Sequence, residues 1–503
     1  MHEKPISTLE MSIIDVNSEF LGVSRHLLME NAGRGIADLA WKICQETNRS
    51  EIIIFAGKGG NGGDGMVAAR HLAWHLPITV YLMGSSHAIN KGSTKTNWKI
   101  LCQMTNTVRT VEIKDSTDVT KIKTHPKALI IDALLGTGIR GEMKNPILSI
   151  LEKINSWKKK GAFVISIDTP TGVDPNTGQL SNIFLTPQRT FCLHRPKKGL
   201  STENSGRIDV ISIGVPPEAE EIVGPGDLLA LKTRQSWSKK GDHGKILVIG
   251  GNETYSGAPT LAAMAAIRAG TDLVTILTPD NISAAIRSYS PELIVQPLST
   301  PHLAKESITL DLISQNDVVL LGPGLGTHPD TAEAVKSILD MVKSQKKPIV
   351  IDADALKLID TKLLSEQTIL TPHSGEFERL TGKKLPTGRN QFENRKQLVY
   401  QATSSSPNIW VVKGHWDIVA DTNYLKVNKT GTPLMTRGGT GDVLAGIIAG
   451  LIPQTASLFY AACIGVYLNG RAGELSIQNF SLPQLLQHIP LAIQEGLDFI
   501  RKE

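Results

Sequence analysis

Two glycine-rich segments of the sequence each place an aspartate just before an apolar stretch. The first is AGKGGNGGDG at residues 56–65, and the second is RGGTGDVLAG at residues 437–446. Glycines allow backbone N–H groups to approach an anion closely, and a helix that starts at such a turn adds partial positive charge. Both segments are therefore predicted to bind phosphate, with a plain tight turn as the alternative for the first.

The second segment also supplies a group that can transfer a proton. Gly438–Gly441 precede a predicted helix whose first turn holds Asp442, and unpaired N–H groups there would form an anion hole. The helix dipole is expected to help keep Asp442 ionised, ready to take a proton from a hydroxyl that attacks phosphorus. A carboxylate repels a neighbouring phosphate, so catalysis explains this placement better than a plain N-terminal acid does.

Two more aspartates end apolar runs in the first half of the chain. Asp132 lies in IIDALLGTGIRGE, and Asp168 lies in SIDTPTGVD. A single aspartate at such a position is often an N-cap or a turn residue. Ligands of open α/β sheets bind at the carboxyl ends of the strands, so two such acids beside glycine loops favour a binding site.

The elements that would position these residues follow an alternating pattern. Short β-branched runs alternate with helical patterns, which is typical of α/β folds with parallel sheets covered on both faces. The expected strands are residues 52–56, 78–82, 128–132, 163–168, 208–213, 245–249, 273–277, 318–321, 348–351 and 409–412. Helices are expected near 258–269 and 442–451, and VVKGHWD at 411–417 predicts a strand pair with a tight turn.

The length of 503 residues exceeds what one hydrophobic core usually supports. Prolines, glycines and charges gather in residues 214–244, before a fresh strand begins. We therefore predict one domain at residues 1–218, a linker at 219–238 and a second domain at 239–503.

Composition excludes several classes of protein. A formal net charge of +5, spread along the chain, does not make a nucleic-acid-binding stripe. The four cysteines are far apart, and the longest apolar run is too short to span a bilayer. We expect a cytoplasmic protein without nucleic-acid or membrane partners. The basic cluster RPKKG at 195–199 is interpreted as solvated charge, with phosphate binding as the alternative.

Four motifs of the first domain together resemble the NAD(P)H-hydrate epimerase family: LMENAGR at 28–34, GNGGDG at 60–65, DALLGTG at 132–138 and DTPTGVD at 168–174. The resemblance implies a Rossmann-like three-layer domain that interconverts the R and S epimers of hydrated NADH and NADPH. It also implies a potassium ion held by Asn61, Asp132 and Thr171, and oxygen donors suit such a hard cation. The implied hydrate contacts are Gly60, Asn61, Gly62, Gly63, Asp64, Gly136, Thr137, Gly138, Ile139, Arg140, Gly141, Glu142 and Asp168. Within this picture, Asp168 is the expected catalytic acid–base group.

The second domain resembles the ADP-dependent NAD(P)H-hydrate dehydratase family, within the ribokinase-like three-layer fold. The motifs that carry this resemblance are GDHGKILVIGG, YSGAP, GPGLG, DADAL, LTPHSGEFERL, VKG and GGTGDVLAG. Small-molecule kinases of this fold carry an asparagine where this chain has His373, which argues against a vitamin or sugar kinase. The implied hydrate contacts are Ala258, Gly324, His373 and the catalytic Asp442. The implied nucleotide contacts are Lys413, Gly414, His415, Trp416, Asp417 and Gly441.

The combined prediction is a bifunctional nicotinamide nucleotide repair enzyme. The first domain would use K⁺, and the second would use Mg²⁺ and the co-substrate ADP, with Glu376 as a water-mediated partner of the magnesium ion. The small-molecule partners would be hydrated NADH (NADHX), hydrated NADPH (NADPHX) and ADP, and a homo-oligomer is the expected assembly. The alternative is a ribokinase-fold small-molecule kinase fused to a non-catalytic nucleotide-binding module.

Overall fold

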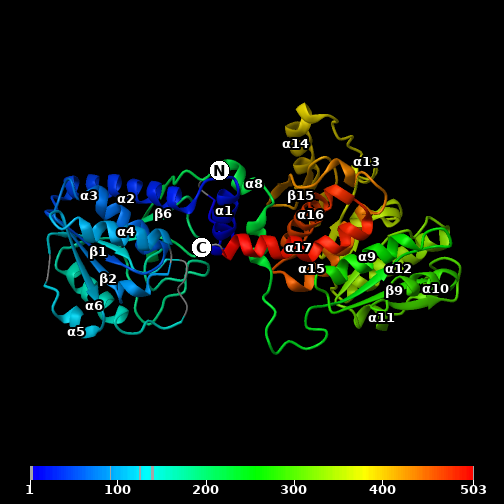
Figure 1. The fold of residues 1–503 in the computed structure, drawn as a ribbon, viewed down its shortest axis with the longest axis horizontal. Helices are drawn as coiled ribbons and strands as arrows, with labels where there is room; N and C mark the ends of the chain where they lie inside the picture. The colour runs from blue at the N-terminus through cyan, green and yellow to red at the C-terminus, as the bar shows by residue number, and fades with distance from the viewer. Residues whose placement is uncertain (1–3, 91, 124–125, 137–140, 502–503) are drawn as a thin grey trace. The chain divides into compact units, whose positions relative to one another are not determined.

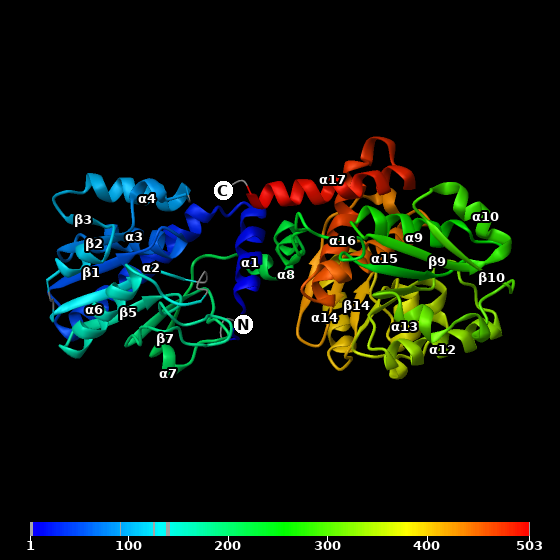
Figure 2. The ribbon, with the colours of Figure 1, turned by 90° about the horizontal axis from the view of Figure 1, so that it is seen from below.

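The structure is a computed structural model that describes residues 4–90, 92–123, 126–136 and 141–501. The chain forms two compact units that divide between Ala219 and Glu220 (Figures 1 and 2). Each unit contains one sheet with helices on both faces, so the predicted α/β class is confirmed. No helix among the described residues combines the length and the apolar character needed to cross a bilayer.

Unit 1 is built on a seven-stranded parallel sheet with the order β3-β2-β1-β4-β5-β6-β7. The strands are β1 (Glu51–Ala56), β2 (Ile78–Met83), β3 (Val108–Ile113), β4 (Ala128–Ala133), β5 (Phe163–Ile167), β6 (Arg189–Leu193) and β7 (Arg207–Ile211). This is the Rossmann-like, doubly wound order, extended by one strand. The order reverses between β1 and β4, and such a switch point opens a crevice at the carboxyl ends of the two strands.

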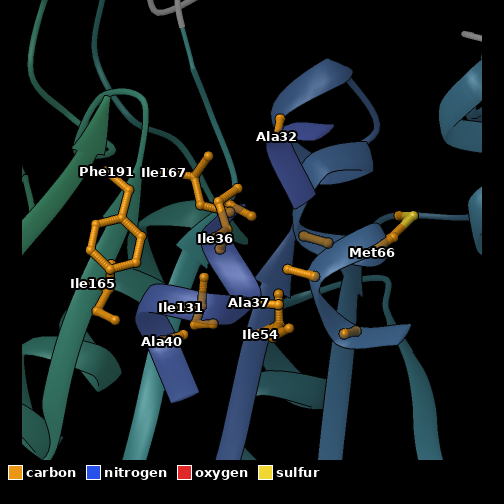
Figure 3. Packing of buried hydrophobic residues seen from close by; sticks show 14 of the residues in the cluster. Ala32, Ile36, Ala37, Ala40, Ile54, Met66, Ile131, Ile165, Ile167 and Phe191 are labelled. Atoms are coloured by element: carbon orange, nitrogen blue, oxygen red, sulfur yellow. The ribbon is translucent and has the colours of Figure 1, made fainter. Parts of the chain in front are cut away.

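The helices of unit 1 cover both faces of this sheet. They are α1 (Thr8–Phe20), α2 (Arg25–Thr47), α3 (Gly60–Leu72), α4 (Gly92–Gln103), α5 (Ser116–Thr120), α6 (Ile147–Lys159) and α7 (Thr202–Ser205). Figure 1 shows α2, α3 and α4 on one face, and α5 and α6 on the other. On the first face, Ile36 of α2 and Met66 of α3 are fully buried with Ile54 and Ile131 of the sheet (Figure 3). This packing fixes where α3 begins, and α3 begins at the first glycine segment.

Unit 2 contains a nine-stranded sheet with the order β10-β9-β8-β11-β12-β13-β14-β15-β16. The strands are β8 (Lys245–Ile249), β9 (Leu273–Pro279), β10 (Ile294–Leu298), β11 (Val318–Leu321), β12 (Ile349–Ile351), β13 (Thr368–Leu370), β14 (Ile409–Val412), β15 (Asp417–Ala420) and β16 (Leu425–Asn428). The strands from β10 to β14 are parallel, whereas β15 and β16 add an antiparallel edge. The order again reverses between β8 and β11, so unit 2 has its own switch point.

Helices also cover both faces of the second sheet. They are α9 (Gly257–Arg268), α10 (Asp280–Tyr289), α11 (Leu310–Ser314), α12 (Pro329–Ser344), α13 (Ser374–Thr381), α14 (Phe392–Thr403), α15 (Thr440–Leu451), α16 (Leu458–Leu475) and α17 (Leu482–Arg501). Figure 2 shows α9, α15 and α16 on the face opposite α12, α13 and α14. The helices expected near 258–269 and 442–451 are present as α9 and α15.

Helices α9 and α15 pack with their backbones in close contact. A Cβ atom built on Gly446 of α15 would lie 2.0 Å from the carbonyl oxygen of Ala262 in α9. Only glycine allows this approach, because a backbone oxygen cannot move away cheaply. The contact therefore sets the position of α15, and with it the position of Asp442.

We predict that Gly446→Ala destabilises unit 2. The extra methyl group forces the two helices apart, and overpacking of this kind costs about 1–3 kcal/mol. Thermal unfolding of the full chain should show the loss. The matched control is Gly257→Ala at the start of α9, where a built Cβ atom meets nothing within 4 Å. Equal melting temperatures for the two variants would contradict the packing argument.

The segment 219–238, predicted to be a linker, is in its first part a packed piece of unit 2. Its 3₁₀ turn at Pro225–Ala230 is mostly buried, and Leu228 is 1% exposed. Asp227 is wholly buried and forms an ion pair with Lys426 of β16, which compensates its charge. The exposed part begins after this turn, where residues 232–240 form a continuous exposed stretch. The prediction missed this because the ion-pair partner lies far away in the sequence.

Candidate active sites

The first glycine segment and the loop after β4 flank the switch point of unit 1. Helix α3 begins at Gly60, and its N-cap residue Gly59 provides no side-chain cap for the first N–H groups. A Cβ atom built on Gly57 would lie 1.9 Å from the oxygen of Leu134, and one built on Gly62 would lie 1.9 Å from the oxygen of Gly57. The glycines thus let two backbone turns touch directly, and they leave an uncapped helix start at the sheet edge, as an anion site requires.

Asp132 is wholly buried at the end of β4. Its Oδ2 accepts hydrogen bonds from Ser166 Oγ at 2.8 Å and from the Thr171 N–H at 2.9 Å, and its Oδ1 accepts one from Thr171 Oγ1 at 2.7 Å. Burial raises the pKa of Asp132, although these hydrogen bonds oppose the shift. The structure therefore brings Asp132 and Thr171, two predicted potassium ligands, into direct contact.

Asn61, the third predicted potassium ligand, lies beside the same loop. Its Nδ2 donates to the carbonyl oxygen of Leu135 at 3.3 Å, while the Leu135 N–H donates to Thr171 Oγ1 at 3.3 Å. The Oδ1 atom of Asn61 is buried and has no hydrogen-bond partner among the described residues. Asn61 is thus linked to the Asp132 carboxylate through Leu135 and Thr171, and a buried oxygen without a partner in such a set of oxygen donors fits a monovalent cation.

Asp168 follows β5 in a left-handed conformation, with φ of 62°. Its Oδ1 accepts a hydrogen bond from the Leu193 N–H at 3.1 Å and pairs closely with the ammonium group of Lys197. The side chain of Lys197 is 0% exposed, so the interpretation of RPKKG as solvated charge is wrong for this residue. Burial is tolerated because the partner carboxylate compensates the charge. Sequence reasoning missed Lys197, since only the fold brings it to Asp168.

Some of the other hydrate contacts expected in unit 1 lie among the described residues, and the rest do not. Gly60, Asn61, Gly62, Gly63 and Asp64 form the first turns of α3. Gly136, Gly141 and Glu142 border the segment 137–140 in sequence. Thr137, Gly138, Ile139 and Arg140 lie outside the described residues.

The second glycine segment lies at the start of α15 in unit 2. Its N-cap residue, Gly439, has φ of 97° and makes no side-chain cap. The first N–H groups of the helix are therefore free of any capping side chain, and Asp442 occupies the first turn beside them. A phosphoryl group bound at this helix start would meet aligned N–H donors and a carboxylate together.

The electrostatics around Asp442 differ from the sequence-based expectation. Burial and then Asp352 raise the pKa of Asp442 to about 7, with a further contribution from Asp354, while Lys413 opposes the shift. The helix dipole therefore does not keep the carboxyl strongly ionised. A pKa near neutral pH suits a general base, because such a group is both available and basic enough to take a proton.

Lys413 connects Asp442 to the sheet edge. Its Nζ lies 2.7 Å from Asp352 Oδ1, which also accepts a hydrogen bond from Thr371 Oγ1 at 2.7 Å. Burial is the largest single effect and opposes the positive charge of Lys413, but Asp352, Glu376 and Asp442 together outweigh it and raise the pKa of the ammonium group. A Cβ atom built on Gly441 would lie 3.3 Å from this Nζ. The structure thus places a permanent cation directly beside the uncapped helix start.

The turn that joins β14 and β15 is the strand pair predicted from VVKGHWD. The two strands are antiparallel, and Trp410 pairs with Ala420. The Gly414 N–H donates to Asp417 Oδ1 at 3.1 Å, and burial raises the pKa of Asp417. His415 and Trp416 stack with their ring centroids 5.4 Å apart, and Phe392 meets Trp416 edge-on. Polar groups and aromatic rings at one turn suit an adenine nucleotide.

Arg395 of α14 is a residue that sequence reasoning missed in this turn. Its Nη2 donates to the Lys413 carbonyl oxygen at 3.0 Å, and its Nη1 donates to Ser374 Oγ at 3.1 Å. Burial lowers the pKa of the guanidinium group. Arg395 therefore fixes the backbone of the turn, and no local sequence signal marks it.

His373 has a structural role that its sequence context did not reveal. Its Nδ1 accepts a hydrogen bond from the Gly375 N–H at 3.0 Å, and its own N–H donates to Glu376 Oε2 at 2.9 Å, so it caps α13. The Lys413 N–H donates to the carbonyl oxygen of Pro372 at 2.9 Å, which places His373 beside the Lys413 turn.

Two expected hydrate contacts meet at the switch point of unit 2. A Cβ atom built on Gly324 would lie 3.2 Å from the Cβ of Ala258. Gly324 follows β11, and Ala258 lies in the first turn of α9 after β8. The structure brings these two residues together, as a substrate crevice between β8 and β11 requires.

Comparisons with known proteins agree with this geometry. The family model described as NAD(P)H-hydrate dehydratase matches residues 246–495, and the one described as YjeF-related protein N-terminus matches residues 25–199. The chain is 38% identical to the bifunctional NAD(P)H-hydrate repair enzyme Nnr of Methanothermobacter thermautotrophicus, over 98% of this chain and 95% of the relative. The same enzyme of Methanocaldococcus jannaschii is 38% identical, over 96% of this chain and 93% of the relative.

Among solved structures, the chain is similar over part of its length to an ADP/ATP-dependent NAD(P)H-hydrate dehydratase from Bacillus subtilis, co-crystallised with ATP and Mg²⁺. The identity is 24%, the match covers 55% of this chain and 98% of that chain, and the TM-score is 0.46. The two sheets and their uncapped helix starts define a two-unit α/β protein with a candidate anion-binding site in each unit. Because it is 38% identical to both of these relatives over nearly its full length, the chain belongs to the family of bifunctional NAD(P)H-hydrate repair enzymes.

Proposed function

We propose that this chain repairs hydrated NADH and NADPH. Unit 1 interconverts the R and S epimers of the hydrate, and unit 2 dehydrates the S form with ADP, which yields AMP and phosphate. The observation that carries the proposal is the start of α15. Asp442 lies in its uncapped first turn, and the ammonium group of Lys413 lies beside that turn. Family membership over both units supports the pairing of the two activities.

The groups of unit 2 account for the chemistry of dehydration. Asp442 takes the proton of the C6 hydroxyl as that oxygen attacks the terminal phosphorus of ADP. The N–H groups at the start of α15 and the ammonium group of Lys413 stabilise the charge of the phosphoryl group in transfer. Phosphate then leaves C6 with the C–O bonding electrons, the ring nitrogen supplies electron density, and C5 loses a proton to the departing phosphate. Reduced nicotinamide, AMP and phosphate result.

Mg²⁺ fits the acidic residues at this edge. The ion prefers octahedral oxygen ligands, and it is commonly held by one or two carboxylates together with substrate phosphates. Asp352, Asp354 and Glu376 supply carboxylates near Lys413 and Asp442. Glu376 would act through water, because both of its oxygens contact His373. When bound, the ion shields phosphate charge, while Lys413 and the α15 N–H groups orient the phosphoryl group.

In unit 1, Asn61, Asp132 and Thr171 would hold K⁺ beside the phosphate-binding start of α3. Bound K⁺ would supply positive charge near the hydrate. Asp168 then acts as the acid–base group at the hydrate's carbinol, because its carboxyl lies at the end of β5 on the same sheet edge.

A single assay tests the proposed function. The purified chain is incubated with ADP, Mg²⁺ and a mixture of both hydrated NADH epimers, in K⁺ buffer and in K⁺-free buffer. In K⁺ buffer, we expect the dihydronicotinamide absorbance to return fully. In K⁺-free buffer, we expect only the S form to be consumed rapidly. Consumption of ADP without returning absorbance would instead indicate a kinase that releases a stable phosphoester. Dehydration of the S form without epimer interconversion would restrict unit 1 to binding.

The pKa of Asp442 gives a pH prediction for dehydration. The carboxyl must be ionised to accept a proton, and its pKa of about 7 lies well above the usual value. We therefore expect kcat to fall about tenfold per pH unit below pH 7 and to level off above it. A pH–kcat profile at saturating ADP measures this. A profile that stays flat from about pH 5 to pH 8 would contradict Asp442 as the base.

A further inference from the structure

The ammonium group of Lys197 in unit 1 is fully committed to protein acceptors. The side chain is 0% exposed, and its Nζ contacts Asp168 Oδ1. The same Nζ donates to the carbonyl oxygens of Leu193 and Arg195, each at 3.2 Å. A lysine ammonium has three N–H donors, so none remains for a substrate. Lys197 therefore acts on the chemistry only through its partners.

Asp168 is the charged partner of Lys197, and it is held asymmetrically. Its Oδ1 receives Lys197 and the Leu193 N–H, whereas its Oδ2 makes no hydrogen bond to any described residue. Its main chain adopts φ of 62°, and its N–H donates to the Phe191 carbonyl oxygen at 2.8 Å. One oxygen is thus anchored, and the other is left available for proton transfer.

Other titratable groups surround this pair. Burial raises the pKa of Asp15 in α1 to about 6, and Asp168 adds to the shift, while Lys197, Arg25 and His194 oppose it. Burial also raises the pKa of Cys192 to about 12, and its Sγ lies 3.6 Å from the Asp168 carbonyl oxygen. Two carboxyl groups that share a buried site favour retaining a proton unless a cation is present. Lys197 is the cation in direct contact with Asp168.

We propose that Lys197 is a positioning residue for epimerisation: its ammonium group compensates the charge of the buried Asp168 carboxylate and anchors Oδ1, so that Oδ2 faces the hydrate's carbinol. The proposal rests on the proposed function of unit 1. It adds a residue outside the predicted site and assigns different tasks to the two oxygens of Asp168.

The test compares Lys197→Met with Lys198→Met. Lys198 is the adjacent lysine, but it is partly exposed and pairs with Glu10, so its loss leaves Asp168 untouched. Epimer interconversion is followed by chromatography across pH, in K⁺ buffer without nucleotide, so that unit 2 does not consume the hydrate. For Lys197→Met we expect kcat at pH 7 to fall at least about tenfold, KM to change little, and the acid limb of the profile to move up by roughly 1–3 pH units. Lys198→Met should match the wild type.

Two further variants keep the test decisive if Lys197→Met does not fold. Lys197→Arg retains the charge and should keep the acid limb in place, whereas Lys197→Gln retains donors without charge and should move it. The proposal would be overturned if the acid limb of the pH–kcat profile did not shift in Lys197→Met or Lys197→Gln and activity were lost equally at every pH.

A readout without turnover separates this proposal from the function of unit 1. The ¹³C carboxyl signal of Asp168, assigned with Asp168→Asn, is recorded at pH 7 in the wild type as the reference. It should move toward the carboxylic acid form in Lys197→Met and not in Lys198→Met. If this change appears while the wild-type chain fails to interconvert epimers, the pairing stands and the proposed epimerase function falls. An unchanged signal overturns the role of Lys197 directly.

Discussion

Replacing Asp442 with asparagine should abolish dehydration while leaving ADP binding intact. Asparagine has a similar shape but cannot accept the hydroxyl proton, and losing a general base costs about 100- to 10,000-fold in rate. The N–H groups at the start of α15 and the ammonium group of Lys413 remain, so the phosphates keep their contacts. Removal of the carboxylate also removes repulsion toward the nucleotide, so ADP affinity should be unchanged or higher.

The measurement combines single-turnover dehydration of the S hydrate with ADP titration by calorimetry. The matched control is Asp340→Asn, an exposed aspartate on α12 of the same unit, which should behave as the wild type. Wild-type turnover in Asp442→Asn would remove this residue as the proton acceptor. Loss of ADP binding together with turnover would instead show that the carboxylate holds the site together.

The second large effect is expected from Asp168→Asn, which should stop epimer interconversion in unit 1. The rate should fall by about 100- to 10,000-fold, because the variant lacks the acid–base group. Asparagine tolerates the left-handed backbone conformation of this position, so strain is not the cause. The variant leaves Lys197 buried without a charged partner, and breaking such a pair costs about 3–5 kcal/mol.

Folding must therefore be measured alongside epimerisation in this variant. Circular dichroism and thermal unfolding establish the folded fraction, and chromatography follows the two epimers. Asp38→Asn, an exposed aspartate paired with Arg34 on α2, is the control. Unchanged interconversion in a folded Asp168→Asn protein would withdraw the acid–base assignment. Dehydration by unit 2 should continue in the same variant, since Asp442 and its neighbours are untouched.

Most of the strands predicted from sequence are runs whose local pattern specifies burial, and β7 is the exception because it is largely exposed. Strands β1, β4, β8, β11 and β14 are continuous β-branched or apolar runs, because helices cover them on both sides. Most of the missed strands lack that signal, although the buried strand β6 was also missed. Strand β3 is an edge strand with alternating polar residues, β10 is a largely exposed edge strand that contains Pro297, and β13 is only three residues long. Their pairing depends on neighbouring strands, which local propensity does not report.

The candidate sites divide in the same way. The glycine turns and their aspartates were predictable, because a backbone that must approach an anion or another backbone needs glycine at fixed positions. Long-range charge was not predictable. The burial of Lys197 depends on Asp168, and the raised pKa of Asp442 depends on its own burial and then on Asp352; the two aspartates are supplied by different strand ends. Local sequence reveals which residues can do chemistry, and the fold decides their protonation.

The position of the terminal phosphate of bound ADP is the most direct test of this account. A crystal structure of the chain with ADP and Mg²⁺ should show that phosphate within hydrogen-bond distance of the N–H groups at residues 439–442, beside Lys413 Nζ. The Asp442 carboxyl should face the open side where the hydrate's hydroxyl would lie. A terminal phosphate bound away from the start of α15 would contradict the proposed dehydration site.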